Sequence, residues 1–381
     1  MKTYPLGLAS SLYTVFCIAC APGENADANN ADAAPPMDEA AQIAQHMETA
    51  EAASADYPQL FQRVCTQAAE ARPRAAADAT SQPAPATQPN APAPGREGQA
   101  AAATAREGQA APAAAGRRGR GAPQGPPPRS EWYAEPRKVF DNLYFVGQSE
   151  YTAWAVTTSE GIIIIDPIYD WSVEAEVVEG LEKLGLDPRT IKYVLVSHAH
   201  RDHVGGARLL QERYGARVVM GAGDWDLLER STASWPKPVR DMVAEDGQQL
   251  TLGETTLTFY LTPGHTPGTV STIFQVKDGD ATHTAAIWGG TAYNFLGGPE
   301  EARWFGEYIA SAQRFKQLTR DAGADVLISN HSNFDESDTK LAALARRAAG
   351  APHPYVVGSE SIQRYLTVVE ECAKVGLLNV T

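Results

Sequence analysis

The stretch SHAHRDH at residues 197–203 places three imidazoles and one carboxylate within six residues. It directly follows the apolar run 193–196, which predicts a buried strand that ends at the histidines. The first two histidines point to the same side of an extended loop because side chains alternate there, and Asp202 and His203 can turn toward a second point. Neutral imidazoles and ionised carboxylates are typical zinc ligands. Since the chain has only eight histidines in 381 residues, this cluster indicates a metal site.

Two more histidines follow predicted strands. His265 lies in TPGHTPG at residues 262–268, where glycine and proline fix a sharp turn, and His331 closely follows the apolar run 325–329. Strand ends are rigid, so side chains there can converge on one site, and we predict that both histidines are ligands. Asp166 also follows an apolar run, and we expect it either to orient a ligating imidazole or to be a plain turn residue. The histidines outside such motifs, which we expect to be surface or core residues, are His46, His283 and His353.

Together these motifs resemble those of the metallo-β-lactamase superfamily. The resemblance covers roughly residues 132–381, with the motifs in the family's order and approximate spacing. It implies an α+β fold, the αββα sandwich, with the site at one edge and two zinc ions per chain. By this resemblance, the first zinc would be bound by His198, His200 and His265. The second zinc would be bound by Asp202, His203 and His331.

One further position separates the subgroups of this superfamily. Many of its hydrolases, including glyoxalase II-like thioesterases and lactonases, carry an aspartate that bridges the two metals after the strand that ends here at Trp288. This chain has Gly289 and Gly290 there, and it also lacks the cysteine ligand of two lactamase subclasses. The ligand set therefore resembles the third subclass of class B β-lactamases. The segment 330–335 is similar to the final ligand loop of that group.

The resemblance implies a zinc-dependent hydrolase that opens the amide bond of β-lactam antibiotics by a metal-activated hydroxide. Two neighbouring cations lower the pKa of a bridging water toward neutrality, so no protein base is required. Asp202 is the predicted catalytic residue, because a carboxylate on the second metal can orient the nucleophile. From position alone we predict that the substrate is contacted by Thr291, Tyr293 and Asn294. The loop 293–298 offers no basic residue for a substrate carboxylate.

Two other functions remain open at this point. The first is a hydrolase of the same fold that acts on another ester, lactone or thioester, with the lactamase-like ligand set as shared ancestry. The second is an envelope binding or scaffold protein with a vestigial site, although every ligand position is filled. In each enzyme hypothesis the partner is a small molecule, a β-lactam or another cyclic amide or ester. Nucleic acid is excluded as a partner held by bulk electrostatics, because the net charge is −14. We expect a monomer.

The composition changes along the chain and indicates four segments. Lys2 precedes the apolar stretch 6–19, which is typical of a secretory signal, and Cys20 ends a tolerable lipobox where a lipid anchor could be attached. A cytosolic protein with an apolar N-terminal helix is the alternative to a protein of the periplasm, soluble or lipid-anchored to the bacterial envelope. The expected segments are a signal peptide or lipoprotein signal at 1–20, a tether with a short helical segment at 21–71, a disordered low-complexity linker at 72–129 and the hydrolase domain at 130–381.

Export decides the state of the cysteines. If the N-terminal pair is removed or acylated, only Cys65 and Cys372 are left. Two cysteines in an exported protein readily form a disulfide, so we predict a bond between them that ties the segment before the linker to the C-terminal helix.

Apolar periodicity predicts alternating strands and helices in the domain. The predicted strands are 142–147, 151–157, 161–166, 192–196, 255–261, 269–276, 281–288 and 325–329. The predicted helices are 171–184, 205–214, 301–318 and 340–349. Strands followed by helices, twice over, suit two sheets covered by helices on their outer faces.

Overall fold

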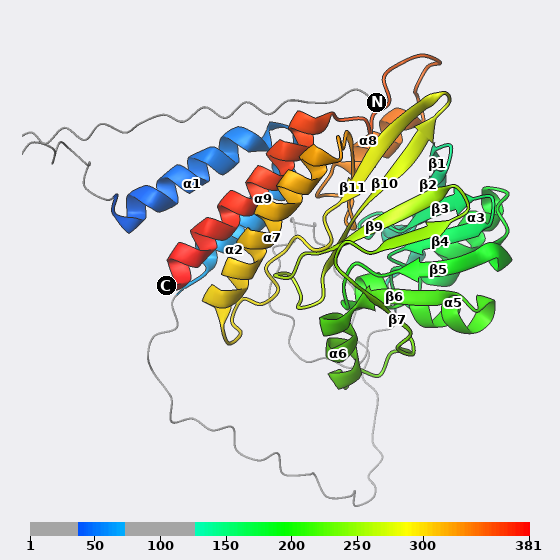
Figure 1. The fold of residues 1–381 in the computed structure, drawn as a ribbon, viewed down its shortest axis with the longest axis horizontal. Helices are drawn as coiled ribbons and strands as arrows, with labels where there is room; N and C mark the ends of the chain where they lie inside the picture. Colours follow the sequence, from blue (N-terminus) through cyan, green and yellow to red (C-terminus); the bar gives the residue numbers. More distant parts are fainter. Residues whose placement is uncertain (1–36, 73–125) are drawn as a thin grey trace, which may run out of the picture. The chain divides into compact units, whose positions relative to one another are not determined.

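The computed structural model describes residues 37–72 and 126–381. The predicted signal at 1–20 and nearly all of the predicted linker lie outside the described residues. The described residues from Glu39 onward belong to one compact unit, so the helical segment before the linker belongs with the domain after it. Figure 1 shows two sheets between layers of helices, which confirms the α+β sandwich that the resemblance implies. Within the described residues, no helix combines the length and apolarity that a membrane span needs.

The first sheet has seven strands in sequence order. They are β1 (Arg137–Phe140), β2 (Leu143–Phe145), β3 (Trp154–Thr158), β4 (Gly161–Ile165), β5 (Ile191–Leu195), β6 (Arg217–Gly221) and β7 (Met242–Ala244). Pairing is antiparallel from β1 to β4 and parallel from β4 to β7. β4 reads GIIII and is buried along its whole length, as expected of a strand covered on both faces.

The second sheet has five strands in the order β12-β11-β10-β9-β8. They are β8 (Gln249–Leu252), β9 (Thr255–Leu261), β10 (Val270–Asp278), β11 (Ala281–Ile287) and β12 (Val326–Ile328). Only β11 and β12 pair in parallel. The core between the sheets joins Phe145 and Leu195 of the first to Phe259, Phe274 and Ile287 of the second. This packing fixes the edge at which the ligand loops leave the strands.

Helices cover the outer face of each sheet. On the seven-stranded sheet lie a π-helical turn (Glu174–Val178), α3 (Glu179–Lys183), α4 (Arg201–Val204), α5 (Ala207–Tyr214) and α6 (Ala222–Arg230). The five-stranded sheet is covered by α7 (Glu301–Asp321) and α9 (Ser359–Val380), and α8 (Ser337–Leu344) packs beside the sheets. Single 3-10 turns occur at Ser54–Asp56, Arg129–Glu131 and Pro188–Thr190.

The segment before the linker forms α1 (Glu39–Ala53) and α2 (Pro58–Glu70). Figure 1 shows both helices in one layer with α7 and α9. In α2 the buried positions Leu60, Val64 and Ala68 recur every four residues and form one apolar stripe that packs into the core around α9. Beside this stripe the structure joins Cys65 to Cys372, the predicted pair, with Cα atoms 4.8 Å apart and a sequence separation of 307 positions.

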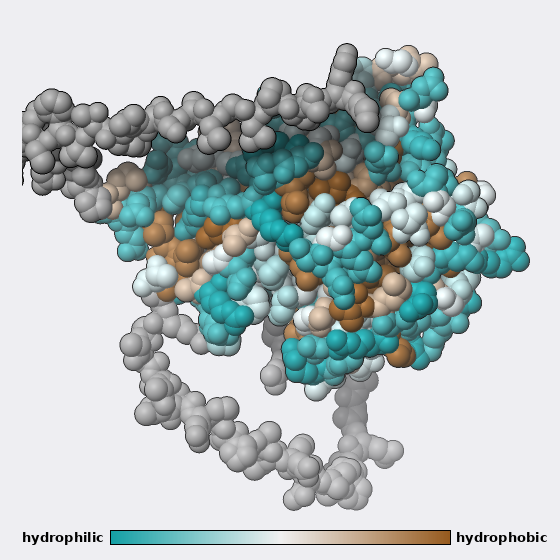
Figure 2. All heavy atoms as spheres, in the orientation of Figure 1, coloured by the Kyte–Doolittle hydropathy of each residue, from teal (hydrophilic) through white to brown (hydrophobic). Residues whose placement is uncertain are grey.

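Every predicted strand and helix has a counterpart, with shifted ends. The predicted helix 171–184 begins as the π-helical turn and only becomes α3 at Glu179. Sequence periodicity did not reveal β1, β6, β7, β8, α4 and α6, and it gave no bounds for the C-terminal helix α9. Figure 2 shows that the face in view is largely hydrophilic with separate hydrophobic patches. Among the described residues, the large apolar side chains most exposed to solvent are Met37, Val239 and Val243.

Candidate metal centre

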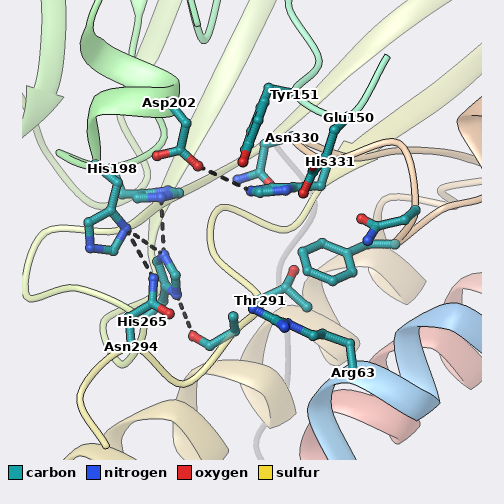
Figure 3. A pocket seen from close by; sticks show the side chains of 14 residues that line it. Arg63, Glu150, Tyr151, His198, Asp202, His265, Thr291, Asn294, Asn330 and His331 are labelled. Atoms are coloured by element: carbon teal, nitrogen blue, oxygen red, sulfur yellow. Dashed lines mark hydrogen bonds and ion pairs between the residues drawn. The ribbon is translucent and has the colours of Figure 1, made fainter. Parts of the chain in front are cut away.

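The predicted ligands meet at one edge of the two sheets, where several strands end. The loop that begins at His198 follows β5, His265 lies between β9 and β10, and His331 follows β12. The chain places these side chains together because parallel and adjacent strands end at a common edge. Figure 3 shows His198, Asp202, His265 and His331 around a single cavity. All six predicted ligands fall into two groups, and in each group the ligand atoms lie within 4.8 Å of one another.

The first group comprises His198, His200 and His265. Nε2 of His265 lies 3.0 Å from Nε2 of His198 and 3.0 Å from Nδ1 of His200. Burial lowers the pKa of all three imidazoles, and the neighbouring histidines lower those of His198 and His265 further. The group is therefore a set of neutral imidazoles whose nitrogens face one point.

The second group comprises Asp202, His203 and His331. Oδ2 of Asp202 lies 3.2 Å from Nε2 of His203 and 3.6 Å from Nε2 of His331. Burial lowers the pKa of His331 to about 3. Burial also disfavours a charged His203, but the carboxylates of Asp202 and Asp166 outweigh it and raise the pKa of His203 to about 10. The second group therefore attracts positive charge, in contrast to the first.

Outer contacts fix which nitrogen faces the centre for three of the imidazoles. Nδ1 of His198 donates to the carbonyl of Gly289 at 2.8 Å, and Nδ1 of His265 donates to the carbonyl of Ala292. Asp166 lies 3.2 Å from Nδ1 of His203, so it orients a candidate ligand rather than serving as a plain turn residue. Partners of this kind set the tautomer of metal-binding histidines.

Asp224 at the start of α6 ties two ligand loops together, and sequence reasoning missed it. Its carboxylate is fully buried and accepts the backbone N–H of Ala199 at 2.7 Å and that of Gly268 at 2.7 Å. It also accepts the hydroxyl of Thr266 at 2.8 Å. A single aspartate within a helix carries no sequence signal for this role, because its partners come from distant loops.

The first group fits a metal ion. A neutral imidazole carries one N–H group. In His198 and His265 this N–H group is on Nδ1 and donates to a backbone carbonyl. Their Nε2 lone pairs therefore face each other at 3.0 Å, which is repulsive unless a cation lies between them. Tetrahedral zinc with bonds of about 2.0 Å separates its ligand nitrogens by about 3.3 Å, close to this spacing. The donor set therefore supports a metal cofactor, for which zinc is the typical ion.

A cavity of about 240 Å³ opens over the two groups. Thr291 and Asn294, which we predicted to contact substrate, line this cavity. The Thr291 hydroxyl pairs with that of Tyr365 at 3.3 Å, whereas the Asn294 side chain is exposed at the mouth, with Nδ2 3.5 Å from Nδ1 of His200. Asn294 is thus the better placed donor.

The predicted substrate contact by Tyr293 is wrong. Its ring is 1 % exposed and packs against Phe305 and Tyr308 in the core. Its hydroxyl donates to the carbonyl of Val369 at 3.2 Å, away from the cavity. The backbone between residues 291 and 298 is irregular, so side chains do not alternate there as they do in a strand, and the sequence does not indicate where each side chain points. Tyr293 is a core residue.

Other residues of the cavity wall were missed from sequence. Tyr151 and Glu150 come from the turn before β3, and Asn333 and Phe334 from the loop after His331. Arg63 comes from α2, before the linker. No local motif marks these residues, since each is ordinary in its own segment. The histidines outside the site lie elsewhere: His46 pairs with Glu371, His283 with Asp325, and His353 with the carbonyl of Val139.

Gly289 and Gly290, where related hydrolases carry a bridging aspartate, pack directly against the site. A Cβ atom on Gly290 would lie 2.5 Å from Cγ and Cδ2 of the His265 ring. A Cβ atom on Gly289 would collide with the carbonyl of Val270. Neither position has space for a side chain: at Gly290 the candidate ligand His265 blocks it, and at Gly289 the Val270 backbone does.

Comparison with known proteins agrees with this geometry. The sequence matches the family described as the metallo-beta-lactamase superfamily over residues 146–285. A subclass B3 metallo-beta-lactamase of Bradyrhizobium japonicum superposes with a TM-score of 0.56 at 30% identity, over 62% of this chain and 91% of that chain. The Rm3 metallo-beta-lactamase superposes with a TM-score of 0.54 at 27% identity, over 62% of this chain and 91% of that chain.

A different kind of hydrolase appears among the sequence relatives. A hydroxyacylglutathione hydrolase of Acidiphilium cryptum is 30% identical over 214 residues, which cover 55% of this chain and 79% of the relative. The similar proteins thus include β-lactamases and a hydroxyacylglutathione hydrolase.

Proposed function

Because the chain belongs to the metallo-beta-lactamase superfamily, we propose that it is a hydrolase of β-lactam antibiotics that works with two zinc ions. The observation that carries this proposal is the close approach of the Gly290 backbone to the His265 ring, next to Gly289, where Val270 leaves no space for a side chain. It leaves no room for a bridging carboxylate, which separates the lactamase-like ligand set from the thioesterase-like one. The 30% identity with a subclass B3 lactamase supports the same choice.

The residues of the site have separate tasks in this proposal. The two ions would be held by the groups of His198 and Asp202, and when bound they supply an activated water at neutral pH. The imidazoles around Asp202 lower its pKa against the effect of burial, so this carboxylate stays ionised and can accept a hydrogen bond from the attacking water. The exposed amide of Asn294 can donate to the oxygen that gains charge at the substrate carbonyl.

A hydrolysis panel tests this proposal. The full chain, purified with zinc, is assayed against a penicillin, a cephalosporin and a carbapenem, with and without a chelator. We expect turnover that the chelator abolishes and added zinc restores. The variant His198→Ala should lose turnover while keeping its folded circular dichroism spectrum. A folded, zinc-loaded protein that is inert toward every β-lactam class contradicts the proposal.

A second candidate is the hydrolysis of a thioester or lactone. It is favoured by the 30% identity with a hydroxyacylglutathione hydrolase over 79% of that relative. The same assay with a hydroxyacylglutathione thioester and a homoserine lactone distinguishes the two candidates. A kcat/KM for either compound well above that for all β-lactams would replace the first proposal with the second.

We further propose that the protein is a monomer exported to the periplasm, either soluble or anchored through Cys20. The apolar stretch after Lys2 and the Cys65–Cys372 pair support export. Cell fractionation of the full chain tests export. Loss of membrane association in Cys20→Ala would support the anchor, and light scattering of the purified protein tests the monomer.

A further inference from the structure

We infer that Arg63 of α2 anchors a carboxylate of the substrate, so that the helices before the linker form part of the active site. For the reaction, this inference rests on the proposed function. It adds the residue that recognises the substrate and the feature that this residue recognises, an anionic group beside the scissile bond. It also resolves a difficulty of the sequence, since the loop 293–298 offers no basic residue for such a group.

The position of Arg63 is the first observation. It lines the cavity together with the candidate ligands His198, His200 and His331. Figure 3 shows its side chain extending from α2 into the cavity. Arg63 is exposed to solvent and forms no ion pair or hydrogen bond with any residue in the described ranges. Its guanidinium is therefore available to a ligand.

The register of α2 explains why Arg63 faces the cavity. Leu60, Val64 and Ala68 are buried against the core around α9, which sets the rotation of the helix about its axis. Cys65, two residues after Arg63, is joined to Cys372 of α9. With the apolar stripe and the disulfide on one side, position 63 is turned toward the opening.

Further contacts hold α2 against the loop on the substrate side and against α9. The side-chain oxygen of Gln67 accepts the backbone N–H of Tyr293 at 3.2 Å. Near the end of α2, the carbonyl of Ala68 accepts a hydrogen bond from the side chain of Asn379 in α9 at 2.9 Å. These contacts make the backbone of α2 a fixed wall of the cavity, so the helix itself need not be ordered when Arg63 binds an anion.

Arg63 is the side chain of the cavity wall whose permanent positive charge can pair with an anion. Among the described residues that line it, Arg63 is the only lysine or arginine, and the carboxylates are Glu150 and Asp202. Burial and the charge of Asp202 raise the pKa of Glu150, and the charge of Arg63 opposes this shift. The planar N–H groups of an arginine match the two oxygens of a carboxylate, and Asn333 adds a neighbouring amide.

A matched pair of substrates tests the inference. Wild type, Arg63→Gln and Arg63→Lys are compared on one cephalosporin and on its carboxylate methyl ester. We expect Arg63→Gln to lower kcat/KM for the acid by about 10-fold, mainly through KM, because an exposed charge-assisted hydrogen bond is lost. For the ester, the kcat/KM values of the three proteins should agree within about 2-fold. On the acid, Arg63→Lys should recover part of the kcat/KM that Arg63→Gln loses. The difference in kcat/KM for the acid between wild type and Arg63→Gln should shrink at high salt.

Two control variants separate position from charge. Gln62→Ala changes an exposed residue of α2 that does not line this cavity, and Arg346→Gln removes a surface charge elsewhere. Neither should change the preference for the acid over the ester. Equal losses on the acid and the ester in Arg63→Gln would overturn the inference, because a merely structural role affects both substrates alike.

A binding experiment keeps this inference separate from the proposed reaction. The dissociation constants of 3-mercaptopropionate and its methyl ester for the zinc-loaded protein are measured by calorimetry. We expect wild type to prefer the acid by about 10-fold and Arg63→Gln to lose this preference. This result supports Arg63 even if no β-lactam is hydrolysed, which would contradict the proposed function alone. Equal preference in the two proteins, or no binding of either thiol, overturns the inference.

Discussion

The carboxylate of Asp224 accepts the backbone N–H of Ala199, which lies between two candidate metal ligands, at 2.7 Å. Its other oxygen accepts the N–H of Gly268, in the loop of the third ligand, also at 2.7 Å. Asp224 therefore links the loop after β5 to the loop after β9. The geometry of the first metal group depends on this link, because its three imidazoles come from these two loops.

The variant Asp224→Asn should weaken metal binding without unfolding the protein. An amide replaces one acceptor oxygen by a donor, so at least one backbone N–H is left facing an N–H₂ group. We expect zinc affinity to fall by about 10- to 100-fold, as for other residues that support metal ligands. Competition with a chromogenic chelator measures this affinity. The control is Asp226→Asn, an exposed residue of the same helix that pairs with Arg240, and it should bind zinc like wild type. Unchanged affinity in Asp224→Asn would contradict the link.

The metal ligands could be predicted because each is close to a buried strand in the sequence. The apolar run before His198 and the turn residues around His265 mark the positions locally. Short strands were harder to predict: β6 reads RVVMG, and an apolar run of this length does not distinguish a strand from part of a buried helix. Its place in the sheet depends on pairing with β5 and β7, which is a tertiary effect.

The wall of the cavity could not be predicted, because it is built from distant segments. Arg63 and His331 are 268 positions apart, and only the packing of α2 on α9 brings them to one cavity. The error at Tyr293 has a related cause. An aromatic residue near a site is as compatible with core packing as with a substrate contact, and the core around Tyr308 decides between them.

The variant Gly290→Ala tests the close approach of the backbone to His265. A methyl group there would lie 2.5 Å from the imidazole ring, so the ring must move from its place in the metal group. We expect zinc affinity to fall by about 10-fold or more, since displaced ligands lose coordination geometry. Gly306→Ala is the matched control, because a Cβ at this helical position meets open space. It should bind zinc normally and be stabilised by about 0.5–1 kcal/mol. Normal zinc binding by Gly290→Ala would contradict the steric argument.

The bond between Cys65 and Cys372 should contribute to stability. It closes a long loop, whose ends are 307 positions apart in sequence, so reduction restores conformational freedom to the unfolded chain. We expect a reductant to lower the free energy of unfolding by about 2–4 kcal/mol, measured by urea denaturation. The double variant Cys65→Ser, Cys372→Ser should be equally destabilised and should not respond to the reductant. Titration of two free thiols at these positions in the exported protein would contradict the bond.

Glu176, in the π-helical turn, is buried on the far side of the seven-stranded sheet from the sandwich core. One carboxyl oxygen accepts the backbone N–H of Ala134 at 3.1 Å, and the other has no partner among the described residues. Burial raises the pKa of Glu176 to about 8. The folded state therefore keeps this proton up to about pH 8, whereas the unfolded chain releases it near pH 4.5.

Between these two pH values the unfolded state binds fewer protons, so Glu176 makes the fold less stable as the pH rises from about 4.5 to about 8. The variant Glu176→Gln is neutral at every pH and removes this dependence. We expect its Tm to exceed that of wild type by at least about 2 °C at pH 8 and to differ by less than about 1 °C at pH 5. Thermal unfolding at both pH values measures the difference. Glu174→Gln, an exposed neighbour that pairs with Arg213, should show no such gain at pH 8. An equal effect of Glu176→Gln at both pH values would contradict the raised pKa.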